Sequence, residues 1–301
     1  MPNEDQPGGP PWTVMTVLQW TANYFKRQGL DHPRGDADIL LAHALGCQRI
    51  DLYLRHDQPL NEAELNLFKQ LVKRRLQHEP VAYIIGVKEF WSLALTVTPD
   101  VLIPRPDTEC LVERSMDLLP ADQSAPAWQV LELGVGSGAI TVALAHERPS
   151  HFYWASDASW PAIQVACTNA RRHGVQDRIR FFAGHWFAPL AQPEAGFDLI
   201  LSNPPYVRRD DIALLAPEIT SYEPLAALDG GPDGLAAIAI IIAAAADYLR
   251  PEGLLLLEIG YDQRDAVAAL ARQVGAYHPI VFHKDYAGHH RVAQMQKRQA
   301  D

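Results

Sequence analysis

Short apolar runs alternate with helix-like segments from about residue 129 to residue 259. The runs lie at 129–133, 152–156, 179–183, 197–202 and 253–259. Helical patterns lie at 138–147, 160–173 and 235–249. This alternation predicts a doubly wound, mostly parallel α/β sheet with helices on both faces. The run from Leu254 to Ile259 is apolar apart from Glu258, as in a central strand buried on both faces. Ligands of such sheets bind beyond the carboxyl ends of the strands, so the residues after each run are candidates for a site.

A glycine-rich turn joins the first run to the first helical pattern. It comprises Gly134, Val135, Gly136, Ser137 and Gly138. Glycines in such a turn allow positive φ and let a ligand approach the backbone closely. Asp157 follows the next strand about 20 residues later, where a carboxylate can accept hydrogen bonds from both ribose hydroxyls. The G-x-G-x-G spacing differs from the dinucleotide pattern, and no Walker lysine is present. This favours a cationic, phosphate-free nucleoside such as S-adenosylmethionine over NAD, in a Rossmann-like domain.

A second candidate cluster, Asn203-Pro204-Pro205-Tyr206, follows the run at 197–202. Proline has no N–H for a strand ladder, so two prolines end the strand and leave carbonyl groups free. The Asn203 side-chain oxygen and the Pro204 carbonyl can then accept both hydrogens of a planar NH2 group, with Tyr206 against its flat face. Such a nitrogen is a weak nucleophile because its lone pair is delocalised. Holding both hydrogens turns the lone pair toward an electrophile. We therefore expect the substrate nitrogen that attacks the electrophile to belong to an amide or to an exocyclic base amine.

Composition narrows the class of protein. The chain of 301 residues has a formal net charge of −10, whereas proteins that hold a DNA duplex usually present basic surfaces. The widely spaced Cys47, Cys110 and Cys167 predict a reduced compartment, without a disulfide framework or a metal site. No apolar stretch is long enough to span a bilayer. We therefore expect a cytoplasmic protein with no metal, no membrane and no direct nucleic-acid partner.

The chain before residue 105 has a different pattern. Helical periodicity, with a capping box at Asn61 and Glu64, predicts a small helical domain. Apolar runs at 83–86 and 93–97 are β-type and predict a hairpin. We expect a disordered extension, a helical domain, a β-hairpin linker and the α/β domain, at 1–12, 13–80, 81–104 and 105–301 respectively.

From about residue 13 onward the chain resembles the HemK/PrmC-type peptide chain release factor glutamine N5-methyltransferases. The resemblance is carried by Gly86–Ser92, Leu102–Glu109, Gly134–Gly138, Asp157, Trp186-Phe187 and Asn203–Tyr206. The segment Pro104-Arg105-Pro106-Asp107-Thr108-Glu109 is more diagnostic than Asn-Pro-Pro-Tyr, which adenine methyltransferases also carry. The fold implied is a methyltransferase α/β domain with a small helical domain in front of it.

The resemblance also implies roles for individual residues. It places S-adenosylmethionine at the segment Gly134–Gly138, at Asp157 and at Asn203, with Trp186 against the adenine. The glutamine amide of the release factor's Gly-Gly-Gln loop is expected to be held by Asn203, Pro204, Pro205 and Tyr206. Asn203, Pro204 and Tyr206 are the expected catalytic residues. Methyl transfer is expected to be direct, and the helical domain and hairpin are expected to recognise the release factor.

Alternative functions share parts of this pattern. A ribosomal-protein glutamine N5-methyltransferase would share the glycine turn and Asn-Pro-Pro-Tyr, but the segment 104–109 argues against it. A DNA adenine N6-methyltransferase would share the target geometry, but the acidic charge argues against it. The non-enzymatic alternative is a regulator that binds the cofactor but has lost activity. The presence of both Asn203 and Tyr206 argues against it. We expect a monomer whose partner is a protein.

Overall fold

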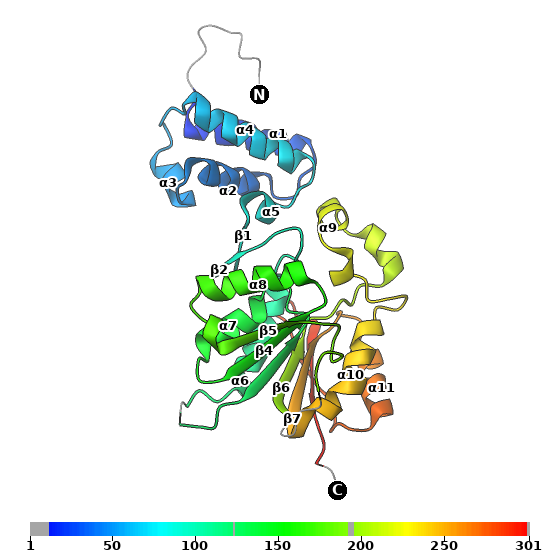
Figure 1. Cartoon of the computed structure of the whole chain (residues 1–301). Coiled ribbons are helices and arrows are strands. Elements are labelled where there is room, and N and C mark those ends of the chain that lie inside the picture. The colour runs from blue at the N-terminus through cyan, green and yellow to red at the C-terminus, as the bar shows by residue number, and fades with distance from the viewer. Residues whose placement is uncertain (1–11, 123, 192–195, 300–301) are drawn as a thin grey trace. The chain divides into compact units, whose positions relative to one another are not determined.

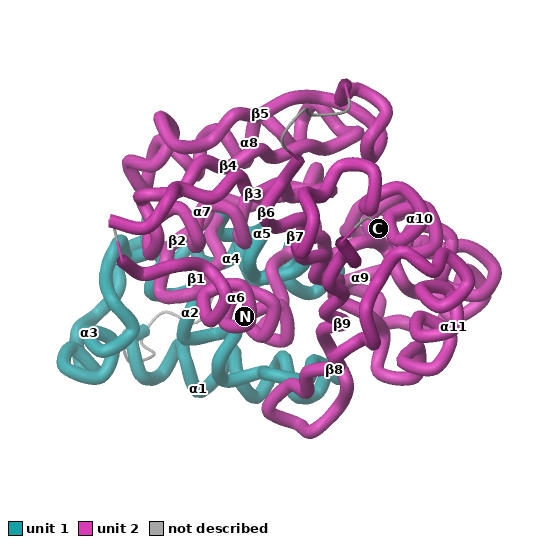
Figure 2. Tube along the Cα trace, turned by 90° about the horizontal axis from the view of Figure 1, so that it is seen from below, with its two compact units in different colours: residues 1–86 teal, residues 87–301 magenta. Residues whose placement is uncertain are grey.

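The structure is a computed structural model that describes residues 12–122, 124–191 and 196–299. The described residues form two compact units, which divide the chain after Gly86 (Figure 2). The first unit is helical, and the second contains the hairpin and the α/β sheet.

The first unit packs amphipathic helices around one apolar core (Figure 1). Its helices are α1 (Val14–Arg27), α2 (Pro33–Leu45), α3 (Arg49–Leu54), α4 (Glu62–Leu76) and α5 (Val81–Ile85). Leu18 and Phe25 of α1 are fully buried with Leu40 of α2, because residues at helical spacing share one face. The predicted capping box of α4 is confirmed. The Asn61 side chain accepts from the Glu64 N–H at 2.9 Å, and the Glu64 carboxylate accepts from the Asn61 N–H at 2.8 Å.

The β-type interpretation of residues 83–86 is wrong, because these residues end helix α5. Pro80 precedes the helix, and Gly86 ends it with a φ of 72°. Tyr83 and Ile84 are buried, and Ile84 belongs to the core of the helical unit. Apolar runs this short do not distinguish a strand from a buried helical turn, and here the contacts with the other helices decide.

The hairpin is confirmed, with a tight turn at its tip. Strands β1 (Val87–Phe90) and β2 (Leu93–Thr96) pair antiparallel. The two turn residues, Trp91 and Ser92, have φ values of 51° and 58°, the left-handed region that two-residue hairpin turns require. The Glu109 carboxylate accepts from the Trp91 N–H at 3.0 Å, which fixes the turn against the start of α6 (Glu109–Leu118).

Within the described residues, the second unit is built on a seven-stranded sheet with the strand order β5-β4-β3-β6-β7-β9-β8. The strands are β3 (Gln129–Leu133), β4 (Phe152–Asp157), β5 (Ile179–Ala183), β6 (Phe197–Ser202), β7 (Leu249–Glu258), β8 (Val281–Lys284) and β9 (His290–Gln296). The pairs from β5 to β7 are parallel, and β9 pairs antiparallel with β7 and β8. The predicted doubly wound, mostly parallel sheet is therefore confirmed.

Helices cover both faces of this sheet (Figure 1). They are α6, α7 (Ala139–Glu147) and α8 (Trp160–Arg172) on one face, and α10 (Ala236–Tyr248) and α11 (Arg264–Val274) on the other. Alternate residues of β7 face the two layers: Leu256 packs in the first core and Leu257 in the second. Both are fully buried, and each such side chain stabilises the fold by about 1.5–3 kcal/mol.

Asn169 of α8 and His173, the residue that follows this helix, satisfy backbone groups of the hairpin. Asn169 accepts from the Thr96 N–H at 2.7 Å and donates to the Thr96 carbonyl at 2.9 Å, as a neighbouring strand would. A ring nitrogen of His173 lies 3.0 Å from the Ala94 carbonyl oxygen. Asn169 also donates to the Ser137 carbonyl at 2.8 Å, so the same side chain fixes the glycine turn.

Candidate active site

Loops that follow β3, β4 and β6 meet at one edge of the sheet and line a cavity of about 500 Å³. This is the carboxyl-end position where doubly wound sheets bind ligands, and the size suits a small organic molecule. The predicted site residues that line the cavity are Gly134, Val135, Gly136, Ser137, Asp157, Trp186, Asn203 and Pro205. Gly138, Pro204 and Tyr206 are not among the lining residues.

Asp157 is held by the backbone around it. One carboxylate oxygen accepts from the Gly136 N–H at 2.9 Å, and the other accepts from the Ser159 N–H at 2.8 Å. Each carboxylate oxygen has a further lone pair, so both can accept from a ligand at the same time. A fixed pair of acceptors beside the glycine turn fits the two adjacent hydroxyls of a ribose.

Gly138 has a packing role at the start of α7. A Cβ atom at this position would lie 3.1 Å from the Ala166 Cβ atom, closer than ordinary contact. The φ of Gly138 is 82°, which other residues adopt only with strain. Glycine therefore lets α7 begin against α8, and this positions the N–H groups of the turn at the cavity.

Trp186 lies beside the glycine turn and lines the cavity. A Cβ atom on Gly134 would lie 3.7 Å from the indole ring, which is ordinary contact. The backbone of Trp186 is in the left-handed region, with a φ of 50°. An aromatic ring that lines the same cavity as the glycine turn and Asp157 is suited to packing against a purine.

Glu132 lines the same cavity and was not predicted from the sequence. Its carboxyl is buried, and it accepts hydrogen bonds from the Thr141 N–H and hydroxyl groups. Burial raises its pKa to about 8, although the Thr141 hydrogen bonds lower it. A buried carboxyl favours a cationic ligand nearby, because a positive charge offsets the cost of ionising it. The sequence did contain one indication of this residue, since Glu132 is an acidic residue within the apolar run 130–133.

The Asn203 side chain has a defined orientation just after the carboxyl end of β6. Its side-chain NH2 group donates to the Thr108 hydroxyl oxygen at 3.1 Å, which leaves the carboxamide oxygen available. Thr108 also lines the cavity, and it ends a 3₁₀ turn, Pro106–Thr108, within the segment 102–109. The sequence placed Thr108 in the segment 104–109 that carries the resemblance but gave it no role, because a contact between positions so far apart in the chain has no local pattern.

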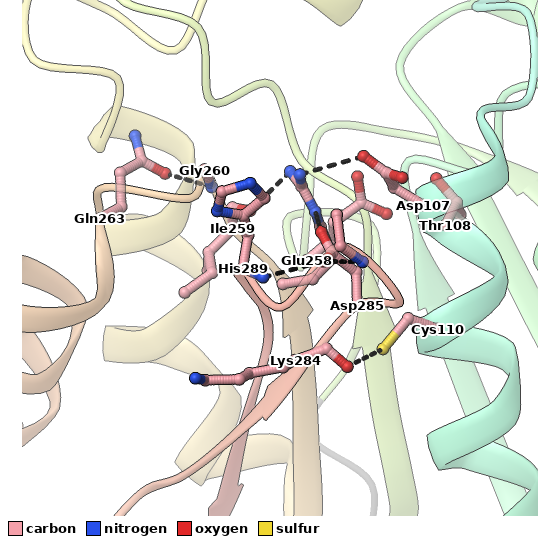
Figure 3. A network of polar contacts seen from close by, with 12 residues as sticks. Asp107, Thr108, Cys110, Glu258, Ile259, Gly260, Gln263, Lys284, Asp285 and His289 are labelled. Carbon is pink, nitrogen blue, oxygen red and sulfur yellow. Dashed lines mark hydrogen bonds and ion pairs between the residues drawn. The ribbon is translucent and has the colours of Figure 1, made fainter.

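The Tyr206 hydroxyl donates to the Glu258 carboxylate at 3.0 Å. Burial raises the pKa of Glu258 to about 7, partly offset by the hydroxyls of Thr108 and Tyr206 and by Arg291. Arg291 itself pairs with Asp107 at 3.0 Å and with Asp285 at 3.3 Å (Figure 3). The acidic residue that interrupts the β7 run is therefore the partner of a predicted site residue.

Comparison with known proteins matches both units of the chain. The family described as the PrmC N-terminal domain matches residues 16–86, and the methyltransferase small domain matches residues 113–219. A release factor glutamine methyltransferase of Geobacter sulfurreducens is 44% identical over 264 residues, which cover 88% of this chain and 90% of that protein. One from Rhodopirellula baltica is 40% identical over 288 residues, covering 95% of this chain and 97% of that protein.

Solved structures share the fold at low sequence identity. A methyltransferase from Pyrococcus furiosus has a TM-score of 0.50 and 18% identity, covering 69% of this chain and 90% of that one. The human methyltransferase 10 domain containing protein has a TM-score of 0.51 and 15% identity, covering 70% and 90%. These neighbours confirm the Rossmann-like methyltransferase fold. The nearly full-length similarity to curated relatives confirms the resemblance seen in the sequence, and the chain belongs to the release factor glutamine methyltransferase family.

Proposed function

We propose that this protein transfers the methyl group of S-adenosylmethionine to the side-chain amide nitrogen (N5) of the glutamine in the Gly-Gly-Gln motif of bacterial peptide chain release factors. The observation that carries the proposal is the fixed carboxamide of Asn203. Its NH2 group is held by Thr108, and its side chain lines the cavity formed with the glycine turn. Its free oxygen is then the group that meets a substrate NH2.

The residues of the cavity fit the proposed cofactor. Asp157 offers two fixed acceptors for the ribose, Trp186 offers a flat face for the adenine, and Glu132 suits the positive charge. When bound, S-adenosylmethionine supplies an electrophilic methyl group on a cationic sulfur. Gly134–Gly138 lets the backbone approach the nucleoside closely.

The chain's own contribution is to orient the substrate amide. In the proposed arrangement the Asn203 side-chain oxygen and the Pro204 carbonyl accept one N–H each, and the amide cannot rotate. Orientation in a near-attack geometry can supply about 7–11 kcal/mol of the barrier. The same two acceptors stabilise the positive character that develops on nitrogen, so no general base is required before transfer. In this arrangement the Tyr206 ring packs on the flat face of the substrate amide, and its hydroxyl donates to the Glu258 carboxylate.

The helical unit is proposed to recognise the release factor as a folded protein. Helix α3 exposes apolar side chains: Ile50, Tyr53 and Leu54 are 59%, 44% and 72% exposed. Exposed aliphatic and aromatic side chains on one short helix suit a protein partner. The acidic net charge supports a partner other than nucleic acid. We also propose a monomer in the reducing cytoplasm, where three free cysteines persist. Within the described residues, none of the helices is both long and apolar enough to cross a membrane.

The decisive experiment compares acceptors. The protein is incubated with methyl-labelled cofactor and, separately, with purified release factor, ribosomal proteins and DNA. We expect label in the release factor alone, on the glutamine of Gly-Gly-Gln, and loss of the label with Asn203→Ala. Label in a ribosomal protein or in DNA instead would replace the proposed substrate with one of the alternatives.

A further inference from the structure

A carboxamide such as Asn203 has a donor at one end and an acceptor at the other, so its neighbours decide which end faces the substrate. In this structure the NH2 end meets the Thr108 hydroxyl oxygen at 3.1 Å. Thr108 is only 4% exposed, so water does not compete readily for this contact. The opposite orientation would present hydrogens to the substrate's NH2 group, and two donors cannot bond to each other.

A threonine hydroxyl that accepts from Asn203 must direct its own hydrogen elsewhere. The Glu258 carboxylate lies beside Thr108, and the Thr108 hydroxyl lowers the Glu258 pKa (Figure 3). Glu258 is fully buried. Its Oε1 atom accepts from Tyr206, and its Oε2 atom has no hydrogen-bond partner among the residues that the structure describes. An ionised carboxylate is an acceptor only, so the unpartnered Oε2 atom of Glu258 is available to accept the Thr108 hydrogen.

We propose that Thr108 and Glu258 are positioning residues for methyl transfer. Ionised Glu258 orients the Thr108 hydroxyl, the Thr108 oxygen holds the Asn203 NH2 group, and the Asn203 oxygen therefore faces the substrate amide. This inference rests on the proposed function for its kinetic consequence. The orientation of Asn203 itself does not depend on which substrate is methylated.

The charges around Glu258 make this arrangement sensitive to pH. Arg291 favours the ionised form, while Asp107 and burial disfavour it, and the pKa lies near 7. The remaining groups that face this carboxylate are Tyr206, the Cys110 thiol, and Asp285, which pairs with Arg291. Protonated Glu258 can donate to Thr108, whose hydrogen then turns to Asn203 and favours the opposite orientation. The rate at saturating substrate should therefore fall as the pH drops below about 7.

The first test needs neither substrate nor activity. In isotope-labelled, substrate-free protein, the side-chain NH2 signals of Asn203 are assigned by their loss in Asn203→Ala and followed by NMR from about pH 6 to pH 8. We expect an inflection in wild type that disappears in Glu258→Gln. Signals that do not respond to pH, or that respond equally in Glu258→Gln, would overturn the proposal even if the release factor proved not to be the substrate.

The second test is kinetic and uses a matched pair of variants. Thr108→Val keeps the shape but removes the hydroxyl, and Thr108→Ser keeps the hydroxyl. Groups that orient a functional side chain typically contribute about 10- to 100-fold. We expect that loss in the single-turnover rate of Thr108→Val with an unchanged cofactor Kd, and recovery of most of the rate in Thr108→Ser. Equal rates for the two variants would overturn the proposal.

Glu258→Gln supplies a readout that a purely structural role would not move. The rate of the wild-type enzyme should rise with pH through about 7, and the variant should lose this step while keeping the cofactor Kd. A variant with a lowered rate but the wild-type pH profile would assign Glu258 to stability alone. Thermal unfolding of each variant confirms that the protein compared is folded.

Discussion

The two halves of the cavity are built differently. On the cofactor side, Asp157 is fixed by backbone N–H groups from Gly136 and Ser159, within about 25 residues of sequence. On the substrate side, the Asn203 side chain is held by Thr108, 95 residues earlier in the chain, and in the arrangement proposed above Glu258 orients Thr108. A site made by the backbone leaves a local sequence pattern, whereas a site made by side chains from distant segments leaves none.

The largest expected effect tests the substrate side. Asn203→Ala removes one of the two proposed acceptors, so the substrate amide is free to rotate. Removal of one positioned hydrogen-bonding group costs about 100- to 1,000-fold in rate, and we expect that loss at saturating release factor. Single-turnover methylation measures it. A rate within a few-fold of wild type would contradict the amide-holding role of Asn203.

The next effect tests the cofactor side. Asp157→Ala removes an ionised acceptor, and loss of such a hydrogen bond costs about 1.5–3 kcal/mol, so we expect a weaker Kd for S-adenosylmethionine. Titration calorimetry measures it. Asp177→Ala is the matched control, because Asp177 is exposed and does not line the cavity. If both variants bind the cofactor as wild type does, Asp157 does not contact the ribose.

A smaller effect concerns Glu132, the side-chain element of the cofactor side. Its folded pKa of about 8 lies above the ordinary value of 4.5, so the folded protein holds a proton that the unfolded chain has lost between those values. The free energy of unfolding therefore falls as pH rises through that window, by up to about 1.4 kcal/mol per pH unit. We expect the free energy of unfolding of Glu132→Gln, measured relative to wild type, to rise by about 2 kcal/mol between pH 6 and pH 8.

Urea unfolding without cofactor, followed at both pH values, measures this difference. A constant difference between variant and wild type would show that Glu132 does not change its protonation in this range. Glu258→Gln gives a second comparison. The Glu258 carboxyl has a pKa of about 7, so its contribution to the free energy of unfolding should be lost at a lower pH than that of Glu132.

The smallest effect tests how closely the backbone is packed on the cofactor side. Gly138→Ala and Gly174→Ala both place a side chain at positive φ, 82° and 69°. Only at Gly138 would the new Cβ atom meet Ala166, at 3.1 Å, since nothing lies within 4 Å at Gly174. We expect Gly138→Ala to be less stable than Gly174→Ala by about 1 kcal/mol. Equal thermal unfolding of the two variants would show that α7 shifts without cost.

The sequence predicted what local periodicity records. The strands from β3 to β6 and the helices α7, α8 and α10 lie where apolar runs and helical patterns placed them, within a residue or so at their ends. Helix α6 was not predicted, because Pro104 and Pro106 and a 3₁₀ turn, Pro106–Thr108, come directly before it. Helix α11 was also missed, although its apolar face buries Val267 and Ala271.

The site was predictable to the extent that it follows strand ends. Asp157 and Asn203 come directly at or after β4 and β6, so their meeting at one edge follows from topology. The role of Thr108 could not be predicted, although the segment 104–109 was quoted, because its contact with Asn203 joins segments that no periodicity links. Glu258 left one signal, an acidic residue in an apolar strand, and its partner Tyr206 became visible only in the fold.

The pairing of Asn169 and His173 with β2 has a consequence for solubility. Two-stranded sheets leave unpaired backbone groups along their edges, and such edges are templates for pairing with another chain. Asn169 of α8 and His173, which caps the end of this helix, occupy the outward N–H and carbonyl groups of Thr96 and the carbonyl of Ala94. This helix therefore protects the hairpin from aggregation along that edge, by taking the place of the strand that would otherwise add to it.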